Sequence, residues 1–406
     1  MKNTFAILLL AVWPVIVTPL RADNPPPGTW ESVASSADGS KIVAASNGRL
    51  GAAGAVYIST NSGATWNSSI IANFDWEAVA SSADGSKLIA AYGLPSSSGL
   101  VYISKNSGVT WAPANISPPA ATWNTVTSSA DGTKLTAGAV NVVAVYTSTN
   151  SGADWTRQTN GLAGVGVDYI ACSADGNKLI AATGGTTGGL YTSTNSGADW
   201  IQATNVPVAT WYCVASSADG NQLLACSYFG GNVYISTNSG VNWTLTKLPT
   251  NDWNSVASSA DGTKLVALAN SDSATLGVGN GGIWTSTDSG TTWVSNKVQS
   301  AAWTCAAMSA DGNELIAGVG FPSTTGGIYV SQTTPSPVLN LATVNGRSTL
   351  SWIIPSMNFT LQQSSDLLAA DWQDMTNVPV LNLTNLENQV ALSPTNGSGF
   401  YRLATH

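Results

Sequence analysis

Residues 59–66 read Ser-Thr-Asn-Ser-Gly-Ala-Thr-Trp, and the recurrence of this stretch decides the fold. The same spacing of serine, asparagine or aspartate, glycine and tryptophan returns five more times along the chain. These further copies end at Trp111, Trp155, Trp200, Trp243 and Trp293. An aromatic, strand-like run such as residues 56–58 precedes each copy. Self-similarity at a regular spacing predicts a repeat architecture.

A second repeat, Ala-Asp-Gly, places one aspartate in each unit, at intervals of 42 to 50 residues. The seven aspartates are Asp38, Asp84, Asp131, Asp175, Asp219, Asp261 and Asp311. Residues 30–36 before the first copy and residues 41–45 after it both look like strands. Ala37-Asp38-Gly39 is therefore predicted to be a three-residue hairpin loop with its glycine in the left-handed conformation. A unit of this length fits a four-stranded propeller blade.

The stretch at residues 59–66 resembles the Asp-box (BNR) repeat, Ser-x-Asp-x-Gly-x-x-Trp. The resemblance implies a hairpin between the third and fourth strands of each blade of a β-propeller. This chain departs from the pattern at the acidic position, where only Asp288 is acidic. The other copies carry Asn61, Asn106, Asn150, Asn195 and Asn238. Asparagine still accepts hydrogen bonds from loop amides, so we expect a structural role there and no cation site.

The end of the repeat array is less regular, because residues 331–335 depart from the Asp-box pattern. We expect a three-stranded last blade; the alternatives are a fourth strand from residues 335–344 or from the segment before Trp30. After that point short alternating runs appear, and the placements of Trp352 and Tyr401 loosely resemble a fibronectin type III module. The predicted fold is all-β.

In this prediction a seven-bladed β-propeller with Asp-box hairpins spans residues 23–334, and a small C-terminal β-sandwich spans residues 335–406. Residues 1–22 have the pattern of a signal peptide, with Lys2, an apolar run and Leu20-Arg21-Ala22 before the predicted cleavage site. We therefore expect export to the periplasm, the cell surface or the medium. The apolar run is short for a bilayer span, so no membrane insertion is expected after cleavage.

Composition excludes several function classes. The formal net charge is −8, which would repel phosphate backbones, so nucleic acid is not an expected partner. The only histidine is His406, at the extreme C-terminus, which argues against Ser-His-Asp, Cys-His and His-rich metal chemistry. No cofactor and no metal are predicted.

The four cysteines form an even set, which invites a disulfide interpretation in an exported protein. They are Cys172, Cys213, Cys226 and Cys305. A three-residue loop at residues 218–220 would set Cys213 opposite Ala225 and turn Cys226 toward the other face of the sheet. On this register we expect no bridge between them and four small core-filling side chains.

Two enzyme families with Asp-box propellers were compared with the chain. Sialidases need an arginine triad and an Arg-Ile-Pro signature, whereas the repeats here contain only Arg49 and Arg157. Xyloglucan-cleaving glycosidases need two carboxylates and pair two propellers, and this chain has one. The candidate carboxylates are Glu31, Glu77 and Asp168, which share one repeat position, and Asp75, Asp252 and Asp272 in neighbouring loops.

The two ends of the predicted propeller differ in sequence. The Ala-Asp-Gly and Asp-box hairpins are nearly invariant and lie at one end, whereas the loops between second and third strands vary and lie at the other. Six first strands begin with a tryptophan at that variable end: Trp30, Trp76, Trp123, Trp211, Trp253 and Trp303. Such a ring could form a platform for sugars or peptides, although a residue repeated in each blade is also typical of blade packing.

The resulting hypothesis is an exported, monomeric, non-enzymatic recognition or scaffold propeller that binds a glycan or a protein on its variable-loop face. The predicted ligand-binding residues are the six tryptophans together with Glu31, Glu77 and Asp168. The alternative is a glycoside hydrolase with a carboxylate pair on the same face. The chain also resembles the photosystem II assembly factors with Asp-box propellers, whose arginine-rich binding surface has no counterpart here.

Overall fold

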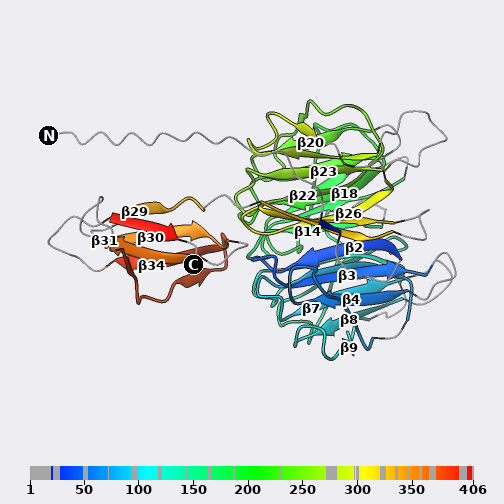
Figure 1. Ribbon diagram of the computed structural model, residues 1–406. Helices are drawn as coiled ribbons and strands as arrows, with labels where there is room; N and C mark the ends of the chain where they lie inside the picture. Colours follow the sequence, from blue (N-terminus) through cyan, green and yellow to red (C-terminus); the bar gives the residue numbers. More distant parts are fainter. Residues whose placement is uncertain are drawn as a thin grey trace.

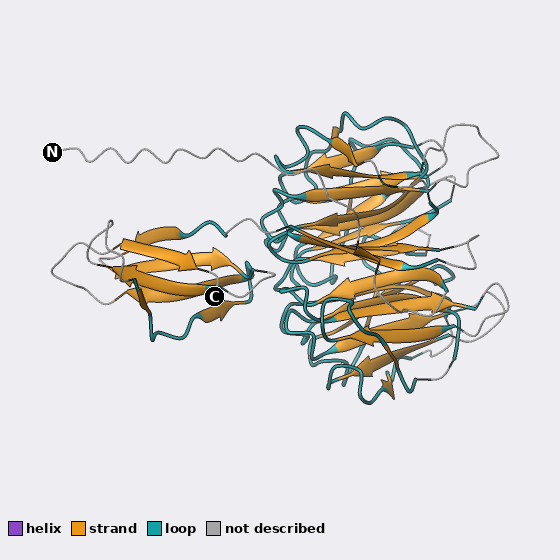
Figure 2. Cartoon of the chain, viewed as in Figure 1, coloured by secondary structure: helices purple, strands orange, loops and turns teal. Residues whose placement is uncertain are grey.

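The computed structural model describes residues 20–21, 28–48, 54–71, 73–93, 99–117, 121–142, 144–162, 166–185, 188–228, 231–270, 281–296, 298, 301–320, 326–333, 337–344, 347–355, 359–364, 372–392 and 400–404. Every regular element in these residues is a β-strand (Figure 1; Figure 2). The strands form a large ring-shaped domain and a smaller domain beside it. The predicted all-β propeller fold is confirmed. The predicted cleavage site and most of the leader lie outside the described residues.

Within the described residues, the large domain contains seven four-stranded antiparallel sheets, each referred to as a blade. Blade 1 comprises β2 (Thr29–Ser35), β3 (Ile42–Asn47), β4 (Ala55–Ser59) and β5 (Asn67–Ser68). Blade 2 comprises β6 (Trp76–Ser81), β7 (Leu88–Tyr92), β8 (Leu100–Ser104) and β9 (Ala112–Pro113), and blade 3 comprises β10 (Trp123–Ser128), β11 (Leu135–Ala139), β12 (Val145–Ser148) and β13 (Thr156–Gln158). Blade 4 comprises β14 (Tyr169–Cys172), β15 (Leu179–Ala182), β16 (Leu190–Ser193) and β17 (Ile201–Gln202), and blade 5 comprises β18 (Trp211–Ser216), β19 (Leu223–Ser227), β20 (Val233–Ser236) and β21 (Thr244–Leu245). Blade 6 comprises β22 (Trp253–Ser258), β23 (Leu265–Ala269), β24 (Gly282–Ser286) and β25 (Val294–Asn296), and blade 7 comprises β26 (Trp303–Met308), β27 (Glu314–Val319), β28 (Ile328–Gln332) and β1 (Leu20–Arg21).

The Ala-Asp-Gly turn is closed by side chains as well as by backbone. In blade 1 the Ser36 hydroxyl donates to Asp38 Oδ1 at 2.6 Å, and the Ser40 amide donates to the same oxygen at 3.1 Å. The Ser36 amide donates to the Lys41 carbonyl at 2.8 Å, so these two residues close the loop. The loop therefore has four residues, one more than predicted. Gly39 has φ 75°, as a left-handed turn requires.

The alanines of these turns form a closed ring of backbone hydrogen bonds around the propeller axis. The Ala37 amide donates to the Ala83 carbonyl at 2.8 Å, and the same bond joins each following pair until the Ala310 amide donates to the Ala37 carbonyl at 2.7 Å. The members of this alanine ring are Ala37, Ala83, Ala130, Ala174, Ala218, Ala260 and Ala310. Alanine suits this position because the blades converge on the axis and leave room only for a small side chain.

The hairpin at residues 59–66 forms between β4 and β5, and its asparagine acts as a turn residue. Asn61 Oδ1 accepts hydrogen bonds from the Ser59 hydroxyl at 3.0 Å and the Thr65 amide at 2.9 Å. The predicted amide-accepting role of Asn61 is confirmed. The Ser62 amide donates to the Ser40 carbonyl at 3.0 Å, which joins this hairpin to the Ala-Asp-Gly turn. Both invariant hairpins therefore lie at one end of the blade, as predicted.

Blade 7 corrects the expectation of a three-stranded last blade. Its fourth strand is β1, in which Leu20 pairs with Val330 and Arg21 pairs with Tyr329. The segment before Trp30, which was one of the alternatives, thus supplies the missing strand. Because residues 331–335 lack the hairpin motif that leads to a fourth strand in the other blades, the outer edge of β28 would be unpaired without β1.

The cysteine prediction was wrong for one pair. Cys213 and Cys226 form a disulfide with a Cα–Cα distance of 5.2 Å, whereas Cys172 and Cys305 are free. The four-residue turn pairs Ser216 with Leu223, which sets Cys213 directly opposite Cys226. The three-residue loop assumed from the sequence shifted the register by one residue, and a shift of one turns every later side chain to the other face.

The small domain consists of two antiparallel sheets. One sheet has the order β29 (Asn340–Val344), β30 (Arg347–Ile353), β34 (Glu387–Leu392) and β33 (Val380–Asn382), and the other has the order β32 (Gln373–Asp374), β31 (Thr360–Ser364) and β35 (Phe400–Ala404). Leu350, Trp352 and Val390 from the first sheet pack against Leu361 from the second. The two sheets thus share one buried core, which gives a small β-sandwich.

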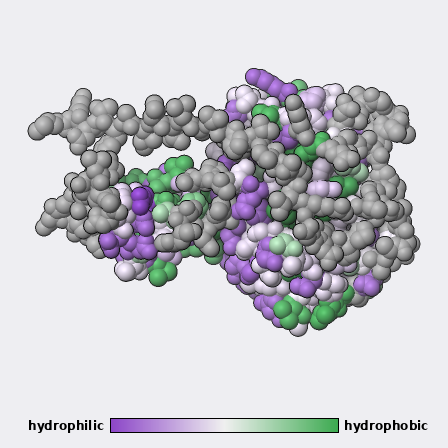
Figure 3. Space-filling model, viewed as in Figure 1, coloured by the Kyte–Doolittle hydropathy of each residue, from purple (hydrophilic) through white to green (hydrophobic). Residues whose placement is uncertain are grey.

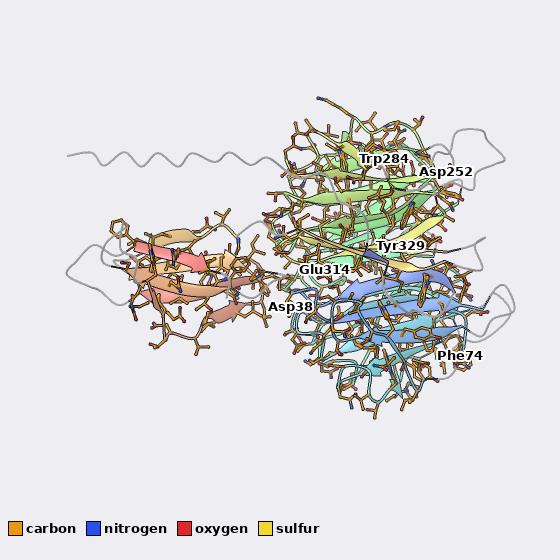
Figure 4. All side chains as sticks on the ribbon, in the orientation of Figure 1. Asp38, Phe74, Asp252, Trp284, Glu314 and Tyr329 are labelled. Atoms are coloured by element: carbon orange, nitrogen blue, oxygen red, sulfur yellow. A yellow bond between two sulfur atoms is a disulfide. The ribbon has the colours of Figure 1, made fainter. Side chains whose placement is uncertain are left out.

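The small domain contacts the propeller at the alanine ring. Ile353, Ile354 and Leu386 pack against buried alanines of the ring. Leu386 ends the turn before β34 with φ 57°, and its carbonyl accepts a hydrogen bond from the Ile354 amide at 3.0 Å. Figure 4 shows Asp38 and Glu314 on the side of the propeller that faces the small domain, and Phe74 and Asp252 toward the other side. The end with the invariant hairpins is thereby partly covered, and the end with the variable loops faces away.

Candidate functional site

The six tryptophans proposed as a ligand platform are buried side chains that pack the blades together. Their exposed fractions are 2% or less. Each indole lies edge-on to the aromatic residue of its own third strand, with ring centroids 5.0 to 5.7 Å apart. Trp123, for example, packs on Tyr146 in blade 3 and on Ile89 and Val101 of blade 2. The platform prediction is corrected, because a ligand cannot contact these rings unless the blades separate.

The residue directly after each of these tryptophans is the more informative position. In blade 1 the pairing of β2 with β3 shifts between Trp30 and Ser32, so that the intervening residue has no opposite partner. Corresponding shifts occur in the other five blades that begin with tryptophan. The bulge set comprises Glu31, Glu77, Asn124, Tyr212, Asn254 and Thr304, together with Asp168 at the equivalent place before β14. A β-bulge changes the direction of its side chain relative to the regular strand pairing, and β-bulges are common beside functional sites.

Three members of the bulge set tie neighbouring blades together. The Asn124 side-chain amide donates to the Asp168 carbonyl at 2.9 Å, and the Thr304 hydroxyl donates to the Trp30 carbonyl at 2.5 Å. The Asn254 amide reaches the Trp303 carbonyl of blade 7 at 3.3 Å. Each bond runs from one blade to the next, so the primary role of these three side chains is structural.

The acidic members of the bulge set are held by neighbouring polar groups. Glu31 accepts a hydrogen bond from the Asn47 side chain, and Asp168 accepts one from the Gly184 amide. Burial raises the pKa of the Asp168 carboxyl, and the bond from Gly184 lowers it in part. All three acids, including Glu77, are only partly buried. The structure therefore leaves these carboxylates partly accessible to solvent at the variable-loop end.

The other predicted carboxylates differ in their surroundings. Asp75 accepts a hydrogen bond from the Gly48 amide at 2.7 Å and is half-buried. Asp252 is 1% exposed, so it packs inside the fold. Asp272 lies outside the described residues.

Three tyrosines near the acids form an aromatic stack that sequence reasoning missed. The Tyr212 and Tyr228 rings stack with centroids 4.7 Å apart, and the Tyr169 ring is tilted by 45° against Tyr212 with centroids 5.0 Å apart. All three are half-buried, and burial raises the pKa of Tyr169 well above its ordinary value, with further contributions from Tyr212, Asp168 and Glu31. The stack therefore lies within electrostatic reach of two acids of the bulge set.

The sequence did contain a signal for this stack. The position after each first-strand tryptophan varies between acid, amide, phenol and hydroxyl while its neighbours stay nearly constant. Variation at one position of a constant scaffold is typical of recognition. The prediction instead emphasised the constant tryptophan, which marks packing.

The axial channel contains a cavity of about 170 Å³ at the other end of the domain. Serines of the first strands line it, and Leu386 of the small domain contributes to the lining. These serine hydroxyls make hydrogen bonds within the fold. Those of Ser81 and Ser216, for example, each donate to the carbonyl of the following residue at 2.9 Å. The cavity is therefore a structural feature of the axis.

The surface in Figure 3 is a mixture of polar and small apolar patches, with apolar patches at the lower edge of the propeller near β8 and β9. Exposed apolar residues such as Ile201, Val241 and Val294 belong to the fourth strands or their hairpins.

Among the described residues, no three His, Cys, Asp or Glu side chains are grouped so that they could hold a metal ion. A helix long and apolar enough to cross a membrane is likewise absent from the described part of the chain.

No protein-family model and no curated protein matches the sequence. Solved structures match in fold. A GH74 xyloglucanase from Xanthomonas campestris has a TM-score of 0.59 at 14% identity, and the match covers 83% of this chain and 59% of the xyloglucanase. YCF48 bound to D1 peptide has a TM-score of 0.55 at 16% identity, covering 78% of this chain and 97% of YCF48.

YCF48 from Cyanidioschyzon merolae has a TM-score of 0.56 at 14% identity, covering 77% of this chain and 98% of that protein. This chain therefore spans 59% of the xyloglucanase and nearly all of either YCF48 chain. Fold is shared more widely than function, so these identities support an architecture and no activity. The comparisons show that the chain has a β-propeller fold.

Proposed function

We propose that this chain is an exported recognition propeller that binds a glycan or a protein on its variable-loop end, without turnover. The observation that carries the proposal is the bulge set. One position in an otherwise repetitive strand varies in chemistry from blade to blade, and it lies at the end of the propeller that the small domain leaves uncovered. A rigid scaffold with variation confined to one end is the usual design of a binding protein.

The chemistry at blades 4 and 5 suits a sugar ring or a polar peptide. Stacked phenol rings offer apolar surface and hydroxyl groups together, and such side chains are common in recognition sites. The Asp168 carboxylate beside Tyr169 supplies hydrogen-bond acceptors for hydroxyl or amide donors. Tyr212 and Asp168 are the residues that we propose to contact the ligand, with Glu31 and Glu77 farther around the ring.

Export is part of the proposal and rests on two features. Residues 1–22 have the pattern of a signal peptide, and Cys213 and Cys226 form a disulfide. Cleavage after residue 22 would remove β1, so blade 7 of the mature chain would keep three strands. Disulfides persist mainly in oxidising compartments, so this bond supports export. We also propose that the hairpins of the blades belong to the Asp-box class and that the small domain is related to fibronectin type III modules, and that the protein acts as a monomer.

The proposal is tested by retention of the purified chain on immobilised xyloglucan, cellulose and xylan, and by protein capture from the native culture medium. Tyr212→Asn places at the bulge the residue that blades 3 and 6 use, so folding is expected to survive. Thr304→Asn is the matched control at the same position of blade 7. We expect Tyr212→Asn to weaken retention at least tenfold and Thr304→Asn to leave it within twofold.

Equal retention of the two variants and the unmodified chain would remove the tyrosine stack from the proposal. Release of reducing ends from any of the same polysaccharides would instead favour the glycoside hydrolase alternative. In that event Asp168→Asn and Glu31→Gln would separate catalytic carboxylates from binding ones, because a catalytic carboxylate loses turnover while retention remains.

A further inference from the structure

Blade 7 carries an unusual buried acid at the place where the ring closes. The residue that ends each Ala-Asp-Gly turn is lysine in five blades, glutamine in blade 5 and Glu314 in blade 7. The lysines join neighbouring blades: Lys41 Nζ donates to the Asp84 carbonyl of the next blade at 2.8 Å, and Lys87 Nζ donates to the Asp131 carbonyl at 2.7 Å. These bonds span the seams between blades.

Glu314 occupies the same place at the seam between blades 7 and 1. A methyl group built on Gly39 of blade 1 would lie 2.6 Å from the Glu314 carboxyl carbon, just as one built on Gly132 would lie 2.6 Å from the Lys87 side chain. Ser62 corresponds to Ser151, whose hydroxyl accepts a bond from Lys87 in the sister seam. The glutamate therefore takes the position of the lysine with the opposite charge.

The carboxyl group of Glu314 has no partner of opposite charge. The residue is 0% exposed, and among the described residues neither of its oxygens has a hydrogen bond of normal geometry, although the Ser62 hydroxyl lies near enough to lower the pKa of the carboxyl. The charged groups that face it are both acids, Asp38 from the turn after β2 and Asp311 from the turn before β27. The nearby cation, Lys264, donates to the Asp311 carbonyl at 2.9 Å from the side of blade 6.

We propose that Glu314 is a proton-dependent latch that holds blade 7 against blade 1. In its neutral form the carboxyl O–H can donate across the seam, as the lysine ammonium does in the other blades. In its ionised form the carboxylate has lost its own O–H donor, and Asp38 and Asp311 repel it in a buried site, against which the Ser62 hydroxyl compensates only in part. Loss of the proton therefore weakens the contact that closes the ring.

The contact of Glu314 lies at the seam between blades 7 and 1, where the ring of blades closes. Between neighbouring blades the chain runs from the fourth strand of one blade into the first strand of the next, and β1 likewise runs into β2 of blade 1. Blade 7 differs in that β1 joins the rest of its blade only by pairing with β28, after which the chain continues to the small domain. Closure there depends on contacts such as the bond from the Ala310 amide to the Ala37 carbonyl at 2.7 Å. The proton thus acts beside the blade in which the ring closes by strand pairing and not by a continuous chain.

The direction of the pH effect follows from the surroundings of the carboxyl. Burial raises the pKa of Glu314 to about 8, the Ser62 hydroxyl lowers it, and Asp38 and Asp311 raise it further. In the unfolded chain the pKa is ordinary, about 4.3. The folded chain binds one proton more than the unfolded chain between these values, so stability is highest at the low end of this window and is lost as the pH rises toward 8.

The test is the unfolding of the full chain in urea between pH 5.5 and 9.5. We expect the unfolding constant of the unmodified chain to rise up to tenfold per pH unit and to level off above about pH 8, relative to Glu314→Gln, which keeps a donor and cannot ionise. Glu314→Lys introduces the lysine that five other blades carry at this position. It replaces Glu314→Gln as the reference variant if Glu314→Gln does not fold. Gln222→Glu places a glutamate at the equivalent position of the seam between blades 5 and 6. This variant should lose additional folding stability as the pH rises.

A spectroscopic measurement is independent of folding free energies. At pH 7 the infrared spectrum of the unmodified chain should contain the C=O stretching band of a protonated carboxyl group. This band should disappear when the pH is raised to 9.5. It should be missing at both pH values from Glu314→Gln, or from Glu314→Lys if Glu314→Gln does not fold. Identical pH profiles for the unmodified chain and both Glu314 variants, or a spectrum without that band at pH 7, would overturn the proposal.

Discussion

Replacement of Trp123 by alanine separates the packing role of the tryptophans from a ligand-binding role. The indole is 1% exposed, lies 5.3 Å from the Tyr146 ring and fills the interface with blade 2. Truncation of a buried tryptophan to alanine typically costs about 3–5 kcal/mol, because apolar contact is lost and a cavity remains. The indole N–H has no hydrogen-bond partner among the described residues, so its removal returns part of a desolvation cost of about 1–3 kcal/mol. We therefore expect a loss of about 3 kcal/mol, at the low end of the range.

The assay is equilibrium unfolding in urea, with ligand retention measured separately where both proteins are folded. Trp123→Phe should lose less stability than Trp123→Ala, and Ile70→Ala, at a side chain that is 79% exposed, should change stability by less than about 0.5 kcal/mol. Retention by folded Trp123→Ala should match that of the unmodified chain. A variant of full stability that no longer bound the ligand would refute the assignment of the tryptophans to packing.

Three further predictions concern the scaffold. Cys213→Ala with Cys226→Ala removes a bridge across a separation of 13 residues and should cost about 3 kcal/mol in urea unfolding while the far-ultraviolet spectrum is kept; an unchanged midpoint would contradict it. The pKa of Asp131 is lowered by bonds from Ser129 and Thr133 against the opposing effect of burial, so stability should be lost as the pH falls below about 4, and Asp131→Asn should show a smaller acid-induced loss of the melting midpoint. Leu386→Asp places a charge against the alanine ring and should release the small domain, seen as a larger radius of gyration in X-ray scattering; an unchanged radius would show that other contacts hold the domain.

The repeats made the architecture predictable because each one reports the same local chemistry several times. Gly39 and Asp38 specify the turn, and the hairpin at residues 59–66 specifies the third and fourth strands. What the repeats could not specify was the register, since Ser36 and Lys41 close the turn through a serine hydroxyl as well as the backbone. Counting three loop residues in place of four turned Cys226 to the wrong face.

The candidate site was only partly predictable. Glu31, Glu77 and Asp168 were placed at the correct repeat position, but nothing in an alternating pattern reveals a bulge, because a bulge is a property of two paired strands. Tyr212 was missed because the prediction emphasised the constant tryptophan before it and not the variation at its own position. Ring closure by β1 was equally hidden, since a two-residue strand at Leu20–Arg21 has no periodicity to read.

The most direct test of recognition at the variable-loop end is hydrogen–deuterium exchange of the full chain with and without the polysaccharide or protein that it retains. We predict that ligand slows exchange at residues 166–170 and 210–213, where the tyrosine stack and Asp168 lie, and leaves the Ala-Asp-Gly turns unchanged. Protection confined to those turns or to the small domain, with none around Tyr212, would contradict the proposed site.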